Sequence, residues 1–413
     1  MELYDLKEQE ERVILVGVQE NDGIDTERSL DELAELARTA KASVAGRMIQ
    51  TREAIHPGTY IGKGKIEELK ILVRAANATG IICDDELSAV QIRNLEEALD
   101  CKVMDRTLLI LDIFAARAVS SEGKIQVELA QLRYRASRLS GLGNSLSRLG
   151  GGIGTRGPGE KKLESDRRLI RARITQLKKE LEEVRQHREL LRDGRKKSHI
   201  PSAALVGYTS AGKSSLLNAL TGSEILTDEM LFSTLDTTTR SMKLPDGQEI
   251  LLIDTVGFIH KLPHHLIDAF RSTLEEARYA DLILHVVDTS NPQMELQMQV
   301  VYDTLRQLQA EDKKVITLFN KQDKLPSRTV IRDFHADHSL AVSAKTKEGL
   351  EELGELLSEQ LREGKIYIER CYSYDQAGII SMIRNYGILL EEEYLPEGIA
   401  VKAYVPKEIY ARV

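Results

Sequence analysis

The eight residues from 207 to 214, Gly-Tyr-Thr-Ser-Ala-Gly-Lys-Ser, constrain the fold of this chain more than any other segment. They fit the phosphate-binding pattern G-x-x-x-x-G-K-[ST], between an apolar run at 203–206 and a helix-like segment at 215–220. A strand, a glycine loop and a helix in this order surround a polyphosphate with backbone N–H groups and a helix N-terminus. The predicted phosphate-binding residues are Gly207, Tyr208, Thr209, Ser210, Ala211, Gly212, Lys213 and Ser214.

Two side chains of this P-loop have chemical roles that follow from their types. We expect Lys213 to reach the β- and γ-phosphates, where it also serves catalysis, and the Ser214 hydroxyl to ligate Mg²⁺. The alternative is a plain glycine turn between a strand and a helix. The strand and helix signals on both sides of the loop favour the phosphate site.

A second motif, Asp254-Thr255-Val256-Gly257, follows the apolar run at 250–253. That run lacks alternation and is typical of a buried central strand of a parallel sheet. An aspartate at the carboxyl end of such a strand is placed to hold Mg²⁺ through a water molecule. The Gly257 N–H is placed to sense the γ-phosphate. This is the D-x-x-G switch of regulatory GTPases.

The third motif, Asn320-Lys321-Gln322-Asp323, follows the apolar run at 315–319 and matches the N-K-x-D signature of guanine recognition. A carboxylate accepts hydrogen bonds from guanine N1–H and N2–H₂, and adenine lacks both donors. A buried Asp323 opposite adenine would be left unpaired, and that penalty supplies selectivity. We expect Ser343, Ala344 and Lys345 to complete the base pocket.

A hydroxyl-rich segment lies between the P-loop and the D-x-x-G motif, as expected for a switch that orders over the γ-phosphate and Mg²⁺. One of its threonines should ligate the metal, and composition alone leaves the choice open among Thr234, Thr237, Thr238 and Thr239. The GTP-binding residues predicted in this segment are Phe232, Ser233, Thr234, Leu235 and Asp236.

Phe258 directly follows the D-x-x-G motif, at a position where many GTPases carry a glutamine that orients the attacking water. Phenylalanine cannot hydrogen-bond water. We therefore expect slow intrinsic hydrolysis until a partner orders the switches. We interpret the nearby His260, His264 and His265 as ordinary polar residues of a switch rather than as catalytic bases.

The composition of the 413 residues sets broad limits. No run of 18 apolar residues is present, so no membrane span is expected, and the N-terminus lacks a signal-peptide core. The three cysteines, Cys83, Cys101 and Cys371, are scattered and lack metal-ligand spacing. These features predict a reducing, cytoplasmic location.

Charge is spread unevenly along the chain. Residues 133–197 hold 19 Lys and Arg against 8 Asp and Glu, a net +11, whereas the whole chain has a net charge of −8. Apolar residues recur at three-, four- and seven-residue intervals on both sides of a glycine-rich stretch at 149–162. This pattern predicts an antiparallel helical hairpin with a basic, pliant tip.

A glycine backbone can approach folded RNA closely, and arginines pair with phosphates, so the tip is a candidate RNA contact. The alternative is a flexible linker whose charges merely face solvent. The predicted RNA-binding residues are Arg148, Gly150, Gly151, Gly152, Arg156, Lys161 and Lys162. The motifs give no indication of DNA binding, and we expect a monomer.

Four domains are predicted: an α/β domain (1–118), the helical hairpin (119–197), a doubly wound P-loop GTPase domain (198–363) and a small α+β domain (364–413). In the first, we expect strands at 13–18, 43–46, 81–84 and 102–105. Helices are expected at 29–39, with Ser29 as its cap, from Ile66 onward, and at 87–99. The loop Gly62-Lys63-Gly64-Lys65 could hold a phosphate of a second nucleotide or of RNA, or be a plain turn.

In the last two domains, strands are expected at 202–206, 249–253, 282–287, 315–319, 340–342, 366–368 and 398–405, with a helix at 374–385. The C-terminal domain carries no chemistry that its sequence reveals.

Five segments make the chain resemble the HflX family of ribosome-associated GTPases, which belong to the Obg-HflX-like P-loop GTPases. They are residues 60–65, 150–160, 207–214, 232–236 and 254–259. The glycine-rich tip is the most specific, because ordinary GTPases lack it. The resemblance favours Thr234 as the metal-ligating, catalytic threonine. Thr237 departs from the family, which commonly has proline before the Thr-Thr-Arg sequence.

The resemblance implies GTP hydrolysis, binding to the large (50S) ribosomal subunit, and splitting of stalled or idle 70S ribosomes, with the tip near the peptidyl-transferase region. It also implies, for some members, ATP binding by the N-terminal domain. Two alternatives stay open: an ATP-dependent RNA remodeller that uses the N-terminal domain, and a signalling GTPase whose helical arm binds a protein.

Overall fold

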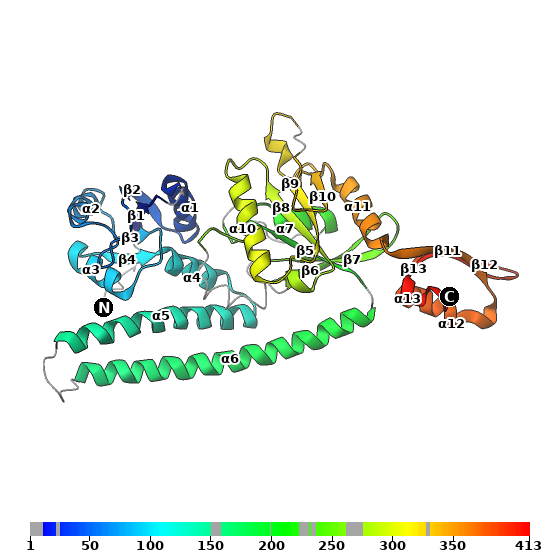
Figure 1. The fold of residues 1–413 in the computed structure, drawn as a ribbon, viewed down its shortest axis with the longest axis horizontal. Helices are drawn as coiled ribbons and strands as arrows, with labels where there is room; N and C mark the ends of the chain where they lie inside the picture. The colour runs from blue at the N-terminus through cyan, green and yellow to red at the C-terminus, as the bar shows by residue number, and fades with distance from the viewer. Residues whose placement is uncertain are drawn as a thin grey trace, which may run out of the picture. The chain divides into compact units, whose positions relative to one another are not determined.

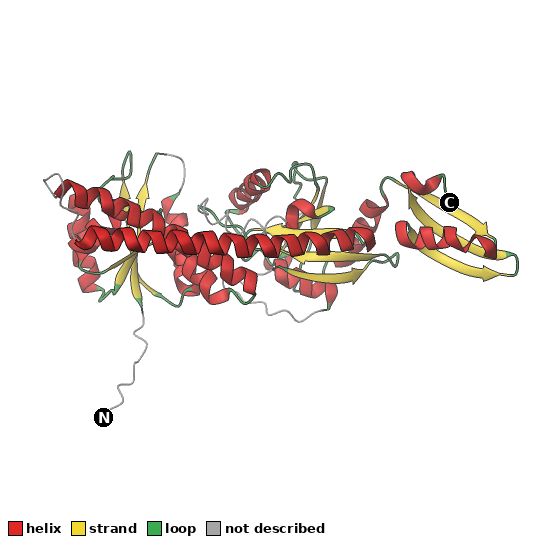
Figure 2. Ribbon diagram, turned by 90° about the horizontal axis from the view of Figure 1, so that it is seen from below, coloured by secondary structure: helices red, strands yellow, loops and turns green. Residues whose placement is uncertain are grey.

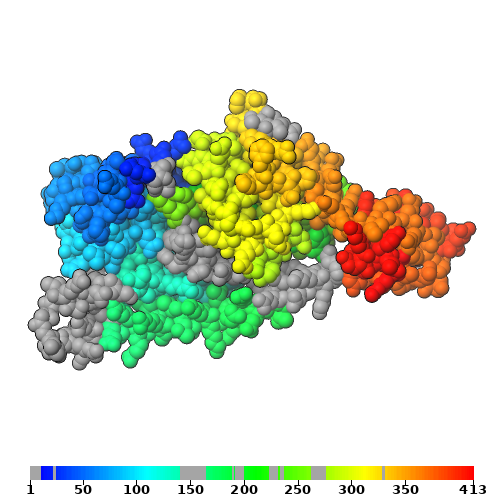
Figure 3. All heavy atoms as spheres, in the orientation of Figure 1, coloured from blue at the N-terminus to red at the C-terminus, as the bar shows by residue number. Residues whose placement is uncertain are grey.

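The computed structural model describes residues 11–21, 25–149, 158–198, 200–222, 231–232, 237–261, 276–327 and 331–413. These form two compact units, the first comprising Met1–Val184, Asp228–Leu235 and Lys261–Phe270, and the second comprising Arg185–Thr227, Asp236–His260 and Arg271–Val413. The predicted domain boundaries at 118, 197 and 363 stay predictions. Figure 3 shows the α/β part of the first unit in blue to cyan.

The first unit contains a parallel sheet with strand order β2-β1-β3-β4 (Figure 1). The strands are β1 (Arg12–Gln19), β2 (Ser43–Thr51), β3 (Gly80–Cys83) and β4 (Lys102–Asp105). The helices are α1 (Thr26–Thr39), α2 (Lys63–Ala75), α3 (Ala89–Leu99) and α4 (Arg106–Arg117). Residues 13–16 of β1 are fully buried because helices cover both faces of the sheet. The predicted α/β fold of this part is confirmed.

Three helix starts in this unit differ from the sequence-based expectation. Helix α1 begins at Thr26 with Asp25 as its cap, not at Ser29, whose hydroxyl instead donates a hydrogen bond to Asp84 Oδ2 at 2.8 Å. Helix α2 begins three residues before Ile66, at Lys63, and α3 begins at Ala89 after a Ser88 capping box rather than at residue 87. Asp25 and Ser88 accept hydrogen bonds from the first free N–H groups of α1 and α3 and decide those two starts locally, whereas the cap of α2 is Gly62, which has no side-chain cap bond.

Helix α4 was not predicted from the sequence. It is apolar around most of its circumference, with Leu109, Ile110, Leu111, Ile113 and Phe114 all buried. The exposed positions of α4 include Asp112 and the small residues Ala115 and Ala116, so its polar stripe is short and the 3.6-residue periodicity that reveals a helix is weak.

The helical hairpin is confirmed as α5 (Ser121–Leu149) and α6 (Pro158–Ser198), which run side by side (Figure 1). Arg173 of α6 donates two hydrogen bonds, at 2.7 and 2.8 Å, to the carboxylate of Glu128 in α5. The expected join at 149–162 placed Lys161 and Lys162 in the loop. Helix α6 instead begins at Pro158, so both lysines belong to its first turns. Proline is favoured at the first helical position.

The remaining tip residues, Gly150, Gly151, Gly152 and Arg156, lie outside the described residues. The side chain of Arg148, near the end of α5, is likewise not described, and neither are those of Lys161 and Lys162. The prediction that these seven residues contact RNA is therefore taken up below as a proposal.

The second unit contains a six-stranded sheet with strand order β10-β9-β8-β5-β7-β6. The strands are β5 (Ser202–Gly207), β6 (Thr238–Lys243), β7 (Glu249–Asp254), β8 (Leu282–Asp288), β9 (Lys314–Asn320) and β10 (His338–Ala341). The helices are α7 (Lys213–Thr221), α10 (Met294–Gln307), η1 (Gln322–Lys324) and α11 (Leu350–Arg362). Strand β5 lies between β7 and β8, so the P-loop and the D-x-x-G motif leave the sheet from neighbouring strands.

All strand pairs of this sheet are parallel except that of β6 with β7. Strand β6 was not predicted, because its sequence Thr-Thr-Arg-Ser-Met-Lys is polar and reads as a continuation of the switch segment. An edge strand with no apolar neighbour on one side does not need an apolar pattern. The doubly wound fold predicted for the GTPase domain is confirmed.

Residues 365–410 of the second unit form an antiparallel sheet with strand order β11-β13-β12. Its elements are β11 (Lys365–Tyr372), η2 (Tyr374–Gln376), α12 (Ala377–Tyr386), β12 (Ile388–Leu395), β13 (Gly398–Pro406) and α13 (Lys407–Tyr410). Figure 2 shows α12 and α13 beside this three-stranded sheet. Ile380 and Ile383 of α12 pack on Val401 and Ala403 of β13. The edge strand β12 escaped prediction because Glu391, Glu392 and Glu393 interrupt its apolar residues.

Candidate nucleotide-binding site

The P-loop turns from β5 into α7 through backbone positions that require glycine. Gly207 has φ +157° and Gly212 has φ +95°, a region that side chains other than glycine rarely adopt. A Cβ on Gly207 would lie 2.3 Å from Val286 O, and one on Gly212 would lie 2.4 Å from Asn320 Nδ2. Val286 O and Asn320 Nδ2 therefore pack closely against the loop. Residues 208–212 lie around the N-terminus of α7.

Lys213, the first residue of α7, is buried with its side chain folded back into the loop. Its ammonium donates hydrogen bonds to Gly207 O at 3.1 Å and Tyr208 O at 2.9 Å. Burial lowers the pKa of Lys213 to about 8, with Asp254 opposing this effect and Lys321 adding to it. An anion bound in the loop would stabilise the charged form and raise this pKa again.

We expect nucleotide binding to take up protons above pH 8. The free protein loses the Lys213 proton as pH rises through about 8, whereas the phosphate-bound form keeps it. GDP affinity should therefore fall about tenfold for each pH unit above that value, as expected for one linked proton. Isothermal titration with GDP at pH 8.5, in two buffers of different ionisation enthalpy, measures the uptake.

The same titration at pH 7 is the control, because Lys213 is already charged there. Equal binding enthalpies in both buffers at pH 8.5 would show that Lys213 does not change its protonation.

Two oxygen groups meet at the carboxyl ends of β5 and β7. Ser214 Oγ donates a hydrogen bond to Asp254 Oδ2 at 2.7 Å, and both residues are buried. Thr255 Oγ1 anchors the following turn by donating to Leu205 O at 2.7 Å. A hydroxyl and a carboxylate are the hard oxygen donors that Mg²⁺ prefers, so the pair fits a magnesium ion that also takes phosphate oxygens.

The D-x-x-G segment lies directly against the P-loop. Phe258 N donates to Gly207 O at 3.0 Å, and Thr209 N donates to Phe258 O at 2.8 Å, which makes a short parallel bridge. A Cβ on Gly257 would lie 2.9 Å from Thr209 Cα and 3.1 Å from Lys213 Nζ. Gly257 therefore sits beside the lysine ammonium, and only a residue without a side chain fits there.

The Phe258 ring is 1% exposed, so it packs inside the protein and offers no group to a water molecule. The buried hydroxyl of Thr209 has no hydrogen-bond partner among the described residues. It lies in the P-loop next to Gly257 and is a polar group that the sequence pattern did not single out.

Asn320 ties the third motif to the P-loop. Its Nδ2 donates to Ala211 O at 2.9 Å, and its Oδ1 accepts from Ala344 N at 3.0 Å. Ser343 Oγ donates to Asp323 Oδ1 at 2.7 Å, and Asp323 is exposed on the rim. Residues more than a hundred positions apart in the chain thus share one rim at the carboxyl ends of β5 and β9.

Lys321 has φ +64° and forms an ion pair with Asp288 Oδ2 at 2.7 Å. Asp288 ends β8 and was not predicted from the sequence, although its position at a strand end was a usable signal. Gln322 is buried, and its Nε2 donates to Phe319 O at 3.2 Å. Lys345 is exposed and follows Ala344 on the rim.

The structure thus brings together the P-loop, the D-x-x-G motif, the N-K-x-D motif and the Ser343-Ala344 turn. Phe232 belongs to the first unit, where its buried ring meets Phe114 edge-on with centroids 4.6 Å apart. The predicted residues Ser233, Thr234, Leu235 and Asp236 lie outside the described residues, as do His264 and His265.

Lys261, four residues after Gly257, also belongs to the first unit. Its ammonium lies 2.6 Å from both Asp84 Oδ2 and Asp85 Oδ1. Burial alone would raise the pKa of Asp84, but Arg106 and Lys261 outweigh it and hold that pKa at about 2. No sequence motif predicts this cluster of Asp84, Asp85, Arg106 and Lys261. Its members are far apart in the chain, and only the folded structure brings β3, α4 and residue 261 together.

In the portion of the chain that the structure describes, no helix combines the length and apolar character needed to cross a membrane.

Comparison with known proteins places these features in a family. Three family models match: "GTP-binding GTPase N-terminal" over residues 27–115, "GTP-binding GTPase Middle Region" over 117–195 and "50S ribosome-binding GTPase" over 202–321. GTPase HflX of Lacrimispora saccharolytica is 64% identical over 410 residues, which cover 99% of this chain and 97% of that protein.

GTPase HflX of Caldanaerobacter subterraneus subsp. tengcongensis is 49% identical and covers 100% of this chain and 95% of that protein. Among solved structures, a GTP-binding protein from Sulfolobus solfataricus in complex with GDP matches with 25% identity and a TM-score of 0.44. That match covers 84% of this chain and 98% of the other.

Proposed function

The chain belongs to the HflX family of GTP-hydrolysing P-loop enzymes, and from this premise we propose that it binds the large ribosomal subunit and separates 70S ribosomes into subunits in a GTP-dependent manner. GTP is its substrate. The helical hairpin α5–α6 presents its basic tip to ribosomal RNA, and the protein acts as a monomer that does not bind DNA.

In the nucleotide site, Lys213 holds the β- and γ-phosphates, and the loop residues 207–212 surround them. Ser214 and Thr234 ligate Mg²⁺ directly, and Asp254 holds it through a water molecule. The bound ion supplies charge neutralisation between the phosphates. Gly257 N–H faces the γ-phosphate, residues 232–236 and 255–256 form the switches, and residues 320–323 with 343–345 enclose guanine. The hydrogen bond of 2.7 Å between Ser214 and Asp254 is the observation that carries this assignment.

The ribosome part of the proposal is supported by charge and by relatives. Residues 133–197 carry a net +11 in a chain whose net charge is −8. A helical hairpin that concentrates positive charge is suited to a polyanion, since each lysine or arginine that meets a phosphate releases a counterion. The match of residues 202–321 to the description "50S ribosome-binding GTPase" points to the same partner.

Co-sedimentation with purified 50S subunits tests the partner. We expect retention with a non-hydrolysable GTP analogue and release with GDP. The double variant Arg156→Ala/Lys161→Ala should weaken binding about tenfold and reduce the slope of log K against log salt by about two, one unit for each lost phosphate contact. The matched control is Lys178→Ala/Lys179→Ala, which removes the same charge from an exposed part of α6.

Equal weakening by both pairs would mean that the tip has no special role. Binding that ignores the nucleotide would reject GTP-dependent action as a whole. Subunit splitting itself is read from the light scattering of 70S ribosomes, where substitution of Gly150, Gly151 and Gly152 by alanine should abolish the signal change but leave the turnover of the free enzyme intact.

ATP-dependent RNA remodelling by the N-terminal domain is the weaker candidate. Gly62 caps α2, and a Cβ there would meet Arg52 Nη1 at 2.8 Å, so a cation does lie at this helix start. However, Lys65 is paired with Glu68 at 2.6 Å, and the nearby Tyr60 hydroxyl donates to Asp85. Carboxylates at the carboxyl ends of β3 and β4 disfavour a triphosphate there. A signalling role for the arm has no observation in its favour.

A further inference from the structure

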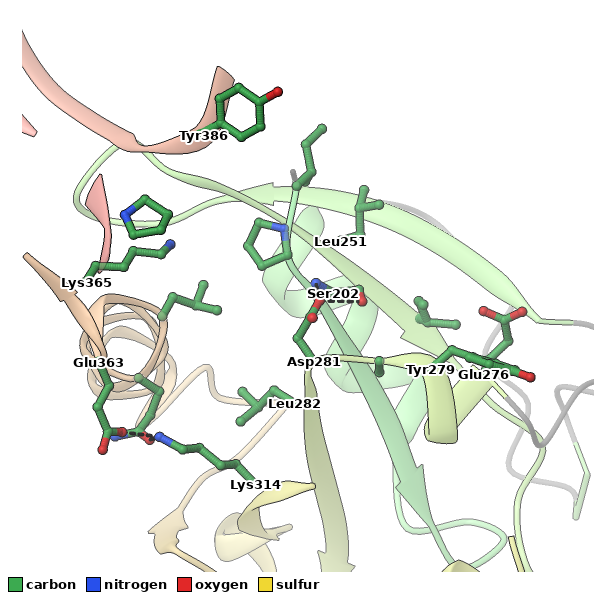
Figure 4. Close-up of a pocket in the computed structure, with 17 residues that line it drawn as sticks. Ser202, Leu251, Glu276, Tyr279, Asp281, Leu282, Lys314, Glu363, Lys365 and Tyr386 are labelled. Atoms are coloured by element: carbon green, nitrogen blue, oxygen red, sulfur yellow. Dashed lines mark hydrogen bonds and ion pairs between the residues drawn. The ribbon is translucent and has the colours of Figure 1, made fainter. Parts of the chain in front are cut away.

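A cavity of about 520 Å³ lies in the second unit, at the sheet edge where β5, β8 and β9 begin. Ligands of doubly wound sheets bind at the opposite edge, where the strands end, so this cavity is separate from the nucleotide site. Its volume falls within the range of about 300–1,000 Å³ that is typical of ligand sites. Figure 4 shows Leu251, Leu282 and Tyr386 among the residues that line it.

The cavity opens onto the C-terminal sheet. Lys365 and Pro406 line the cavity, and they are paired across β11 and β13. The next residues on the same face are Tyr367 and Tyr404, whose rings lie 5.4 Å apart. Helix α12 packs on the other face, against Ile368, Val401 and Ala403. The face that carries the two tyrosines is therefore not covered by α12, and its described cover near Tyr404 is Arg362, whose guanidinium lies 5.1 Å from the ring centroid.

Charged residues follow the tyrosines on this open face. Lys402 pairs with Glu369 on one side and Glu391 on the other, and its Nζ lies 2.8 Å from Glu391 Oε2. Glu393 comes next on the same face of β12 and is exposed. The side chains of Glu369 and Glu391 are 64% and 68% exposed. Two glutamates flank a single lysine and a third follows along β12, so this row is acidic.

The residues that line the cavity do not offset the negative charge of the open face. Its ionisable residues are three acids and two lysines, and one of the lysines, Lys314, is paired with Glu363. The cavity and the open face together carry an excess of negative charge, which repels the phosphates of a nucleic acid. Positive charge on a partner would be attracted instead.

Tyrosines concentrate in this region. Seven of the chain's 13 tyrosines lie in residues 364–413. Among them, Tyr367 and Tyr386, next to the cavity, are 45% and 44% exposed. Tyrosine is enriched at protein interfaces because it offers a large rigid surface at low entropic cost, and its ring also attracts lysine and arginine.

We propose that the cavity and the open face of the C-terminal sheet form one docking groove for a basic protein segment, with a large apolar side chain in the cavity and lysines or arginines over Glu369, Glu391 and Glu393. The groove also specifies a spacing. In β11, Glu369 lies four positions after Lys365 at the cavity, a span of about 14 Å. An extended segment therefore places its basic residue four positions from its apolar anchor.

The test uses full-length protein with GDP and fluorescein-labelled peptides of 12 residues. The probe has phenylalanine at position 3, lysine at positions 7 and 9, and glycine and serine elsewhere. Comparison peptides replace the phenylalanine with serine, replace both lysines with glutamate, or move the lysines to positions 4 and 5. A 12-nucleotide single-stranded RNA is the competing class of ligand. Fluorescence anisotropy gives each Kd.

The probe should bind at least tenfold more tightly than each comparison peptide and than the RNA. Glu391→Lys/Glu393→Lys and Tyr386→Ala should each weaken it at least tenfold. The matched control Glu351→Lys/Glu355→Lys makes the same charge change on exposed positions of α11 and should leave Kd within twofold. Unchanged thermal melting and GDP affinity show that each variant is folded.

Failure of the probe to bind, equal binding of the glutamate peptide, tighter binding of the RNA, or loss of binding in the α11 control would each overturn the proposal. None of these results bears on GTP-dependent ribosome binding, because the variants lie outside the nucleotide site and outside the hairpin.

Discussion

Replacement of Lys213 by alanine is expected to lower GTP affinity and turnover by more than about a hundredfold. The buried ammonium, now bonded to Gly207 O and Tyr208 O, lies beside Gly257. Loss of a buried, charge-assisted hydrogen bond to phosphate costs about 3 kcal/mol or more, which corresponds to that factor. Fluorescent GDP titration and phosphate release measure the two quantities.

Lys243→Ala is the matched control, since Lys243 is exposed at the end of β6. It should leave both quantities within twofold. In co-sedimentation, the Lys213 variant should no longer distinguish the GTP analogue from GDP. A variant that keeps normal GTP affinity would remove Lys213 from the phosphate site and with it the assignment of the P-loop.

Replacement of Asp323 by asparagine is expected to change the base that the protein accepts. Ser343 Oγ already bonds one side-chain oxygen of residue 323, at 2.7 Å, and can bond the asparagine oxygen in the same way. The amide nitrogen of the variant then faces the base, where guanine presents donors and xanthine presents a carbonyl. GTP affinity should fall about a hundredfold, because two donors lose their acceptor.

Affinity for xanthosine triphosphate should rise in the same variant, so that the preference between the two nucleotides reverses. Competition of both nucleotides against fluorescent GDP gives the ratio. Asp312→Asn, at an exposed position before β9, is the control and should keep the preference for GTP. An unchanged preference in the Asp323 variant would show that base recognition resides elsewhere.

The sequence predicted most of the strands that are buried on both faces, because such strands are short continuous apolar runs. Strands β1, β4, β5, β7, β8 and β9 lie within one or two residues of the expected ranges. Strands β6 and β12 escaped prediction for the opposite reason, since an exposed edge and a half-solvated sheet tolerate polar residues. Helix α4 escaped because two of its exposed positions are alanines, which leaves only a short polar stripe.

The candidate site was predictable as a set of motifs but not as a geometry. The motifs indicated that Gly207, Asp254 and Asn320 end strands of one sheet. In that sheet β5 neighbours β7, whereas β8 lies between β5 and β9. The motifs did not indicate that Asn320 would bond Ala211 O, that Phe258 would pair with the P-loop, or that Asp288 would hold Lys321. Each of these contacts joins residues that are at least 30 positions apart in the chain.

By itself, the sequence determined the nucleotide chemistry of this protein, because phosphate and guanine recognition depend on a few residue types at short spacings within single loops. The tertiary structure alone decided which groups of those loops contact one another. It also decided which surfaces form outside the nucleotide site. The acidic, tyrosine-lined face beside a second cavity exists only because β11, β13 and β12 pair in that order. Pairing between distant strands leaves no local pattern in a sequence, because each contact depends on two residues that are far apart in the chain and meet only when the protein folds.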